Sequence, residues 1–430
     1  ANTAVGGLSL KLTTTGAANT AVGYRAMEDN TTGTCNTAVG CAALVTNTTG
    51  RYNSAFGKES LGANTTGEEN VAVGIHALQA NTTADKNTAV GASAMVANTT
   101  GTRNTAVGGE ALDANTTGSY ITAIGQCALG ANTTGTENVA VGQGSLQNNT
   151  TASCNVAVGV SALLINTTGA CNTSVGHCAL CSNTTASNNT AVGFFALKAN
   201  TTGTVSTAVG SCALSGQTTG DNNTAVGFEA LKVATTSKFN TAMGNQALAS
   251  NTTACYNTAV GWRAGCSITT GIRNVAVGYE AGVNATTGAD NVLIGKGAGG
   301  SSSPLNVTTQ SGRVVLGNND VSDSYIKVDW TITSDKRDKM NIKSIPHGLD
   351  FVDKLKPVKF NFKKSREIDA PHGKSKYGFL AQDILELEGN DSVIINNENK
   401  ESLKMTNSHL IPVLVNAIQE LKARIETLEG

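Results

Sequence analysis

Cysteine and histidine are the side chains of this sequence that could bind a metal or take part in redox chemistry. His177, Cys178 and Cys181 lie close together, a spacing typical of half a metal or redox site. Cys154 and Cys171 occupy the same position in consecutive copies of a repeat, so they could approach each other. No spacing in the sequence supplies four ligands, and the other histidines are isolated. We therefore interpret the cysteines as small packing residues and predict neither a metal nor a cofactor.

Asn-Thr-Thr triplets offer a second kind of chemistry, because each is formally an acceptor for an N-linked glycan. Turn formation explains the same residues without a sugar, since Asn and Thr suit a turn and can stack as hydrogen-bonded ladders. Gln217, Ala234 and Ile268 replace the Asn and keep both threonines, so the turn itself needs no glycan. We favour the ladder; glycosylation is the alternative, and ice binding by the threonine array a distant third. The triplets begin at Asn30, Asn47, Asn64, Asn81, Asn98, Asn115, Asn132, Asn149, Asn166, Asn183, Asn200 and Asn251.

The triplets belong to a repeat that is marked by a glycine at every seventeenth position, as at Gly6, Gly23 and Gly40. Eighteen such glycines run from Gly6 to Gly295 without an insertion or deletion. A typical unit reads Asn-Thr-Ala-Val-Gly, then two variable residues, then Ala-Met or Ala-Leu, and later Asn-Thr-Thr-Gly. Such strict spacing indicates that each unit makes one identical structural step.

The composition of the unit predicts β-structure. Thr and Val favour strands, whereas units this rich in Gly and Asn cannot hold a pair of stable helices. Strand alternation places Thr20 and Val22 on one face and Ala21 on the other. We expect Val22 and Met27, with their equivalents, to form a core that the stacked units share. At ~4.8 Å per coil, the stack would be roughly 85 Å long.

The repeat resembles that of trimeric autotransporter adhesin heads, which are left-handed β-rolls, and also repeats of viral and phage fibre shafts. The adhesin-head unit is usually shorter than the unit found here. The resemblance covers about two thirds of the chain, and it implies a repetitive β-solenoid, or β-roll, shaft.

The composition also excludes several classes of protein. Aromatic residues are 4% and charged residues 14%, which is low for a globular enzyme core. A net charge of −1 gives no reason to expect nucleic-acid binding. No stretch is apolar enough to cross a membrane. No paired carboxylates or histidine cluster stand outside the repeat, so we expect no turnover enzyme acting on glycans.

Charge marks a domain boundary. Residues 334–430 contain 31 of the 61 charged residues, so charge density rises more than threefold there. We divide the chain into a shaft (1–297), a linker and β neck (298–333) and a C-terminal domain (334–430). In the neck, 299–304 is expected to be a linker, and 313–317 and 325–330 to be short strands.

The C-terminal domain carries an ordered set of short motifs. They run through Ser334-Asp335-Lys336-Arg337-Asp338-Lys339, Gly348-Leu349-Asp350-Phe351-Val352, Leu355-Lys356-Pro357-Val358-Lys359-Phe360, Tyr377-Gly378-Phe379-Leu380-Ala381-Gln382-Asp383 and Leu410-Ile411-Pro412-Val413-Leu414. This order resembles the self-cleaving intramolecular chaperone domain of endosialidase-type tailspikes and of many phage or virus fibres. Asp383 departs from the family, which more often has Glu there. Such domains are small α+β units that trimerise, register three β-rich shafts and then cleave at the serine that opens the motif.

The resemblance implies that Ser334 and Lys339 form the catalytic dyad of a single self-cleavage. The chemistry is consistent, because a serine hydroxyl is a weak nucleophile that needs a neighbouring base. A lysine can act as that base only when burial favours its neutral form, and trimer assembly could supply the burial. Asp335 and Arg337 match the motif too, and we interpret them as positioning residues.

The chain ends in a heptad pattern over about 409–430, which predicts a coiled coil. Ile at a and Leu at d would favour a dimer by the simple rule, whereas the family forms trimers. We favour a trimer, with Arg424 able to pair with Glu429 of a neighbouring helix. The a and d positions are Ile411, Leu414, Ile418, Leu421, Ile425 and Leu428.

Taken together, these features predict a structural fibre protein of a virus or phage, located on the virion surface or outside the cell. It would be a homotrimer with a host-surface receptor or glycan as a further partner. The alternative is a cellular surface adhesin or a glycosylated extracellular filament with a permanent trimerisation cap.

Overall fold

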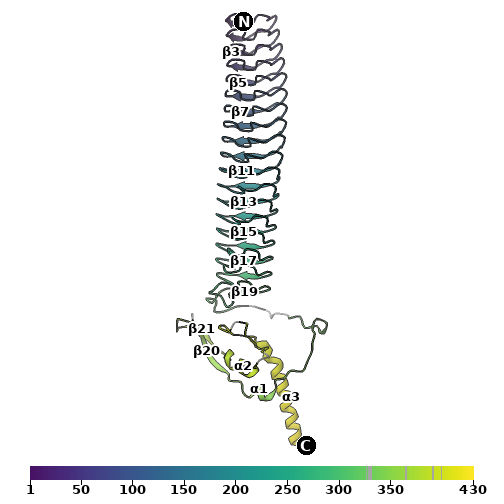
Figure 1. Ribbon diagram of the computed structural model, residues 1–430, viewed down its shortest axis with the longest axis vertical. Helices are drawn as coiled ribbons and strands as arrows, with labels where there is room; N and C mark the ends of the chain where they lie inside the picture. Colours follow the sequence, from purple (N-terminus) through teal and green to yellow (C-terminus); the bar gives the residue numbers. More distant parts are fainter. Residues whose placement is uncertain (326, 328–331, 364–365, 390–391, 399) are drawn as a thin grey trace. The chain divides into compact units, whose positions relative to one another are not determined.

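The computed structural model describes residues 1–325, 327, 332–363, 366–389, 392–398 and 400–430. It divides into two compact units, Ala1–Asn318 and Asn319–Gly430, which are described separately. The first is a stack of coils that contains every strand of one large sheet (Figure 1). The strand predicted at 325–330 falls mostly on positions outside the described residues.

Each coil of the first unit contributes one three-residue strand to a parallel sheet of 19 strands. Neighbouring strands pair in register, so that Thr20, Ala21 and Val22 face Thr37, Ala38 and Val39. The predicted β-solenoid is therefore confirmed. The strands are β1 (Thr3–Val5), β2 (Thr20–Val22), β3 (Thr37–Val39), β4 (Ser54–Phe56), β5 (Val71–Val73), β6 (Thr88–Val90), β7 (Thr105–Val107), β8 (Thr122–Ile124), β9 (Val139–Val141), β10 (Val156–Val158), β11 (Thr173–Val175), β12 (Thr190–Val192), β13 (Thr207–Val209), β14 (Thr224–Val226), β15 (Thr241–Met243), β16 (Thr258–Val260), β17 (Val275–Val277), β18 (Val292–Ile294) and β19 (Val314–Leu316).

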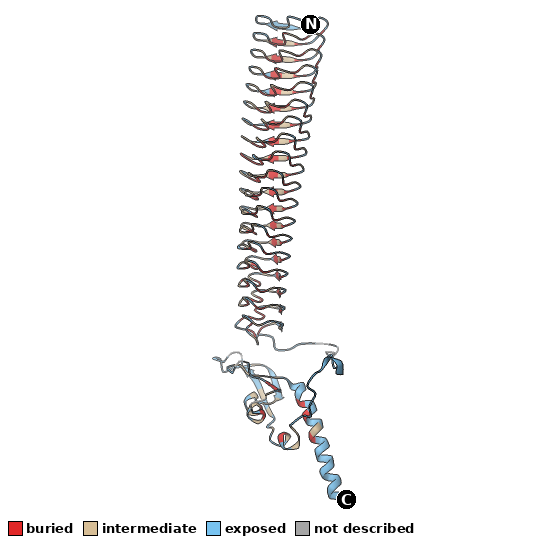
Figure 2. Cartoon of the chain, turned by 45° about the vertical axis from the view of Figure 1, so that its right-hand side comes forward, coloured by how far each residue is buried: buried red, intermediate tan, exposed pale blue. Residues whose placement is uncertain are grey.

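The core of the coil is made of alanine and leucine, not of the strand valines. Ala21 is fully buried, as is Met27, whereas Thr20 and Val22 are only partly covered. The prediction that Val22 and its equivalent Val107 lie in the core is therefore wrong, and Val107 is 36% exposed. The alternation is confirmed, but it is the middle residue of the strand that faces inward, and this residue is alanine in every strand except at Ser174, Leu293 and Val315. Figure 2 shows buried residues along the strands at the centre of the coil wall.

Glycine closes each strand because no side chain fits there. Gly142 has φ +131°, and a Cβ on it would lie 2.5 Å from the carbonyl oxygen of Gly159 in the next coil. Both the left-handed backbone and this close approach favour glycine. The requirement recurs at every coil and explains why the spacing of the repeat is so strict.

The asparagines of the Asn-Thr-Thr triplets form a buried ladder along the stack. Asn115 Nδ2 donates to Asn98 Oδ1 at 2.8 Å, and Asn132 Nδ2 donates to Asn115 Oδ1 at 3.0 Å. All twelve predicted glycan acceptors are 0% exposed. The folded shaft therefore has no space for a glycan on them, and all of these asparagines except Asn251 form the ladder instead. A second ladder joins the asparagines that precede the strands, where Asn36 N donates to Asn19 Oδ1 at 2.9 Å.

The ladder predicts unequal costs for two alanine substitutions. Asn115→Ala should destabilise the shaft by about 2–4 kcal/mol, because it deprives Asn98 Oδ1 of its donor and removes an acceptor from Asn132. Asn251→Ala should cost far less, because Asn251 stands between Ala234 and Ile268 and its buried Oδ1 has no hydrogen-bond partner among the described residues. Thermal unfolding followed by circular dichroism compares the two. Equal losses of stability would contradict the ladder as the source of the cost.

The residues expected to form a linker instead form a last, longer coil. β18 pairs with β19 in parallel register, and Val292 lies opposite Val314. Gly299 N donates to Ser303 Oγ at 3.1 Å, and Val307 is buried where other coils place Asn. The shaft therefore continues to Asn318, and the proposed boundary at residue 297 is too early.

In its described residues, the second unit has two antiparallel strand pairs, several short helices and one long C-terminal helix around a small core. Phe351, Ile384, Ile394, Leu410 and Val413 are among its buried residues. β20 pairs with β21, and β22 pairs with β23. The elements are the 3-10 helix η1 (Lys336–Asp338), α1 (Leu349–Val352), β20 (Val358–Lys363), β21 (Pro371–Gly378), α2 (Ala381–Glu388), β22 (Ile395–Asn396), β23 (Lys404–Met405), the 3-10 helix η2 (Asn407–His409) and α3 (Leu410–Glu429).

Candidate self-cleavage site and assembly helix

Ser334 and Lys339 are brought into contact by one short turn of chain. Lys339 Nζ donates to Ser334 Oγ across 2.7 Å, and η1 fills the space between the two residues. A nucleophile and a base within hydrogen-bonding distance is the geometry that activation of a hydroxyl requires. Both residues are exposed in the single chain.

Asp335 and Arg337 hold this turn in shape. Asp335 caps η1 by accepting from the backbone N–H of Arg337 at 2.8 Å. The Arg337 guanidinium lies 2.6 Å from the Asp335 carboxylate, and this hydrogen-bonded pair holds the pKa of that carboxyl below its usual value. The pair is therefore intact at neutral pH and is lost as pH falls through the lowered pKa. Asp335 thus contacts the backbone between Ser334 and Lys339, and the Arg337 guanidinium holds the Asp335 carboxylate in place.

The C-terminal helix α3 has two apolar faces with different environments. Leu410, Val413 and Ala417 are buried, and the first two belong to the small core. The predicted a and d residues lie on another face and are exposed, from 41% at Leu414 to 86% at Leu428. An apolar stripe of six residues that finds no cover in the described part of its own chain is typical of a helix that packs against other copies. Figure 2 shows the end of α3 as largely exposed.

Contacts with the α1 region fix the direction of α3. Leu349 N donates to Glu420 Oε2 at 2.7 Å, and Asn416 Nδ2 donates to the carbonyl oxygen of His347 at 2.9 Å. Arg424 lies 3.5 Å from Asp350 of the same chain. Arg424, which was predicted to pair with Glu429 of a neighbouring helix, therefore has a different partner here.

A buried carboxylate that the sequence did not reveal anchors the end of α2. Glu388 is 8% exposed and accepts from the backbone N–H groups of Val393, Ile394 and Ile395 at 2.8, 2.7 and 3.0 Å. Nothing in its neighbourhood in the sequence distinguishes it from Glu386, because its donors come from a segment that folds back beside it.

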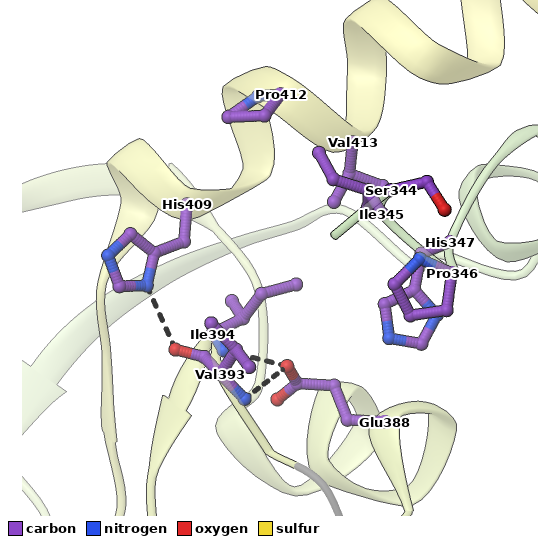
Figure 3. A pocket seen from close by; sticks show the side chains of 10 residues that line it. All are labelled: Ser344, Ile345, Pro346, His347, Glu388, Val393, Ile394, His409, Pro412 and Val413. Atoms are coloured by element: carbon purple, nitrogen blue, oxygen red, sulfur yellow. Dashed lines mark hydrogen bonds between the residues drawn. The ribbon is translucent and has the colours of Figure 1, made fainter. Parts of the chain in front are cut away.

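Glu388 borders a pocket of about 570 Å³. In Figure 3, His409 and the pair Pro346 and His347 lie on opposite sides of this pocket. His409 Nδ1 donates to the carbonyl oxygen of Val393 at 2.9 Å. These contacts tie the start of α3 to the segment that Glu388 holds.

The anchor predicts a specific loss of stability. Glu388→Gln keeps the shape of the side chain but turns an acceptor of three N–H bonds into a group with its own N–H donors, and it should destabilise the second unit by about 2–3 kcal/mol. Glu386→Gln, on the exposed face of the same helix, is the matched control. Hydrogen exchange of the α2 and β22 amides measures the effect, and unchanged protection in Glu388→Gln would contradict the anchor.

All ten cysteines are free thiols. Burial, together with the neighbouring Cys178, raises the pKa of Cys181 to about 11, which disfavours the reactive thiolate. In the part of the chain that the structure describes, no group of three or more His, Cys, Asp or Glu residues could hold a metal ion.

Part of the second unit is similar to a known protein family. Residues 334–392 match the sequence model of a protein family described as chaperone of endosialidase. The match begins at Ser334 and ends before α3, so it is shorter than the resemblance over 334–430. No curated protein matches the chain. Among the described residues, no helix is long and apolar enough to span a membrane. A solenoid followed by a segment similar to the chaperone-of-endosialidase family fits a tail-fibre-type protein with a C-terminal chaperone domain.

Proposed function

We propose that this chain is the protomer of a homotrimeric fibre whose C-terminal unit directs assembly and then cuts itself off at Ser334. The observation that carries the proposal is the apolar stripe of α3, which is exposed in the single chain, in the same unit as the contact between Ser334 and Lys339. The apolar stripe of α3 can be covered only by other copies of the chain. The contact between Ser334 and Lys339 has the geometry of an activated nucleophile.

Self-cleavage can be written from these two residues and water. Lys339 Nζ, in its neutral form, takes the hydroxyl proton while Ser334 Oγ attacks the carbonyl carbon of Thr333 through a five-membered ring. The C–N bond breaks as the Ser334 nitrogen takes the proton back from Lys339, which leaves an ester between Thr333 and Ser334 Oγ. Water hydrolyses the ester to a carboxylate on Thr333, and the serine hydroxyl is restored.

Coupling of assembly to cleavage follows from burial. A lysine in water is protonated and cannot act as a base, whereas one that is desolvated by neighbouring protein can. Packing of further copies against the exposed η1 turn would supply that desolvation. Cleavage would then occur only in chains that have assembled.

The biological setting that this organisation supports best is a virus or phage fibre, with the solenoid as its rigid shaft and host attachment as its role. Sedimentation equilibrium of the purified protein tests the assembly step. A mass three times that of the protomer is expected. A monomer at micromolar concentration would overturn the proposal.

A further inference from the structure

The outward face of the large sheet has a composition that is unusual for a surface. In all 19 strands the first residue is Thr, Ser or Val, and the third is Val, Ile, Leu, Met or Phe. These two positions point away from the alanine core, so they form two parallel columns on the outside of the coil. Neither column contains a charged residue in any described strand.

The columns on either side of this face mix charged, polar and exposed apolar residues. The position two residues before each strand varies freely and includes Glu69, Lys86 and Arg103. The position after the strand glycine also varies and includes Lys58 and Gln126. The restriction to β-branched and apolar residues therefore applies to the two strand columns alone, and it is not a consequence of stacking in general.

The area of the face approaches that of one side of a protein interface. Nineteen strands at ~4.8 Å, with the two columns ~7 Å apart, give a strip roughly 85 Å long and about 600 Å² in area. The third strand residues are partly exposed, 39% at Ile124 and 37% at Val260. In the described strands, neither column is charged and the third-residue column is apolar throughout. An area of about 600 Å² is at the upper end of the patches that typical monomers expose, and it is most of the ~800 Å² that a stable interface covers on each partner.

We propose that this face is where the shafts of one fibre pack against each other, each against a second copy of this chain. This inference rests on the proposed trimer. Only a partner with the same repeat and the same length can cover the strip at every coil. A rotation about an axis parallel to the shaft brings the same column of each copy together, so each valine meets its own equivalents.

Such an interface leaves its own register almost unspecified. Because the columns repeat at every coil, sliding one shaft by a single coil exchanges valine for valine and loses the contacts of only one coil in 19. Phe56 and Met243 are the large exceptions in the column of third strand residues. A slip by one coil therefore brings side chains of different size together at only a few coils. A shaft of this kind needs a separate part of the chain that aligns the copies before their shafts pack together. The C-terminal unit can provide this alignment.

Paired lysine substitutions in the full chain test the interface. Val192→Lys with Val209→Lys puts two charges on the face in the middle of the shaft. Asn188→Lys with Val205→Lys puts them two residues before strands β12 and β13, on an exposed column. The face pair should lower the unfolding temperature of the shaft by roughly 5–10 °C, because it buries charge in an apolar contact, and the control pair should not.

Photo-cross-linking gives an independent readout. Benzoylphenylalanine at Val192 should yield cross-linked shafts on a denaturing gel, whereas at Asn188 it should yield few. Absence of cross-links from Val192, with melting unchanged by the lysines, in a protein that sediments as a trimer would overturn the interface and leave the proposed function standing. A monomer in sedimentation would instead overturn the proposed function.

Discussion

Ser334→Ala and Lys339→Ala chains are expected to remain whole under conditions in which the wild type splits. Removing the hydroxyl removes the nucleophile, and removing the amine removes the base that is hydrogen-bonded to it, 2.7 Å away. Loss of either member of such a pair typically lowers the rate by about 10³-fold or more, so no fragment should appear over hours. Denaturing gels and intact mass measure the outcome. Both variants should still assemble, because neither residue belongs to the core or to the apolar stripe of α3.

Conservative variants separate chemistry from structure. Ser334→Cys should retain cleavage, because a thiol can attack the same carbonyl. Lys339→Arg keeps the positive charge but should block cleavage, because a guanidinium does not give up its proton in proteins. Lys336→Ala, an exposed lysine of the same turn, is the matched control and should cleave normally. Cleavage in Lys339→Arg at the wild-type rate would contradict the role of Lys339 as base.

Replacing Ile418 and Leu421 by aspartate is expected to leave the protein monomeric and uncut. Both side chains lie on the exposed stripe of α3, at 66% and 44% exposure, so a single chain loses little when they change. In an assembly they would be buried, and two charges for each copy in that seam would cost several kcal/mol. Sedimentation velocity measures the oligomer, and intact mass of the same sample measures cleavage.

A control with the same change of charge isolates the seam. Gln419→Asp with Ala423→Asp adds two negative charges to exposed positions of the same helix outside the a and d positions. It should assemble and cleave like the wild type. If the seam variant were monomeric and still cut, cleavage would not depend on assembly, and the coupling between the two steps would have to be abandoned.

The shaft could be predicted from sequence because every coil has the same structural requirements and therefore the same sequence pattern. One glycine at a constant spacing, a three-residue β pattern and a turn triplet were enough for a solenoid with one coil per repeat. The orientation of the strand could not be predicted in the same way. Alternation separates Thr20 and Val22 from Ala21, but which face is inside depends on the width of the coil, and only the folded coil shows that an alanine methyl fills it.

The C-terminal unit was less predictable, because its contacts come from distant segments. The heptad pattern of α3 is local, and it predicted the helix and its apolar stripe. Glu388 accepts hydrogen bonds from three backbone amides of a segment that folds back beside α2. Arg424 contacts Asp350, which lies 74 residues away in the sequence. The last coil of the shaft was mistaken for a linker because it is longer than the repeat and begins with glycines and serines.

Intact mass of the purified wild-type chain under denaturing conditions, beside its mass under native conditions, tests the central claim most directly. Assembly-coupled self-cleavage predicts a native trimer whose chains separate, on denaturation, into residues 1–333 and a C-terminal fragment that comprises residues 334–430. A native trimer built of whole 430-residue chains would contradict it. The C-terminal unit would then be a permanent trimerisation cap, and Ser334 and Lys339 would have no catalytic role.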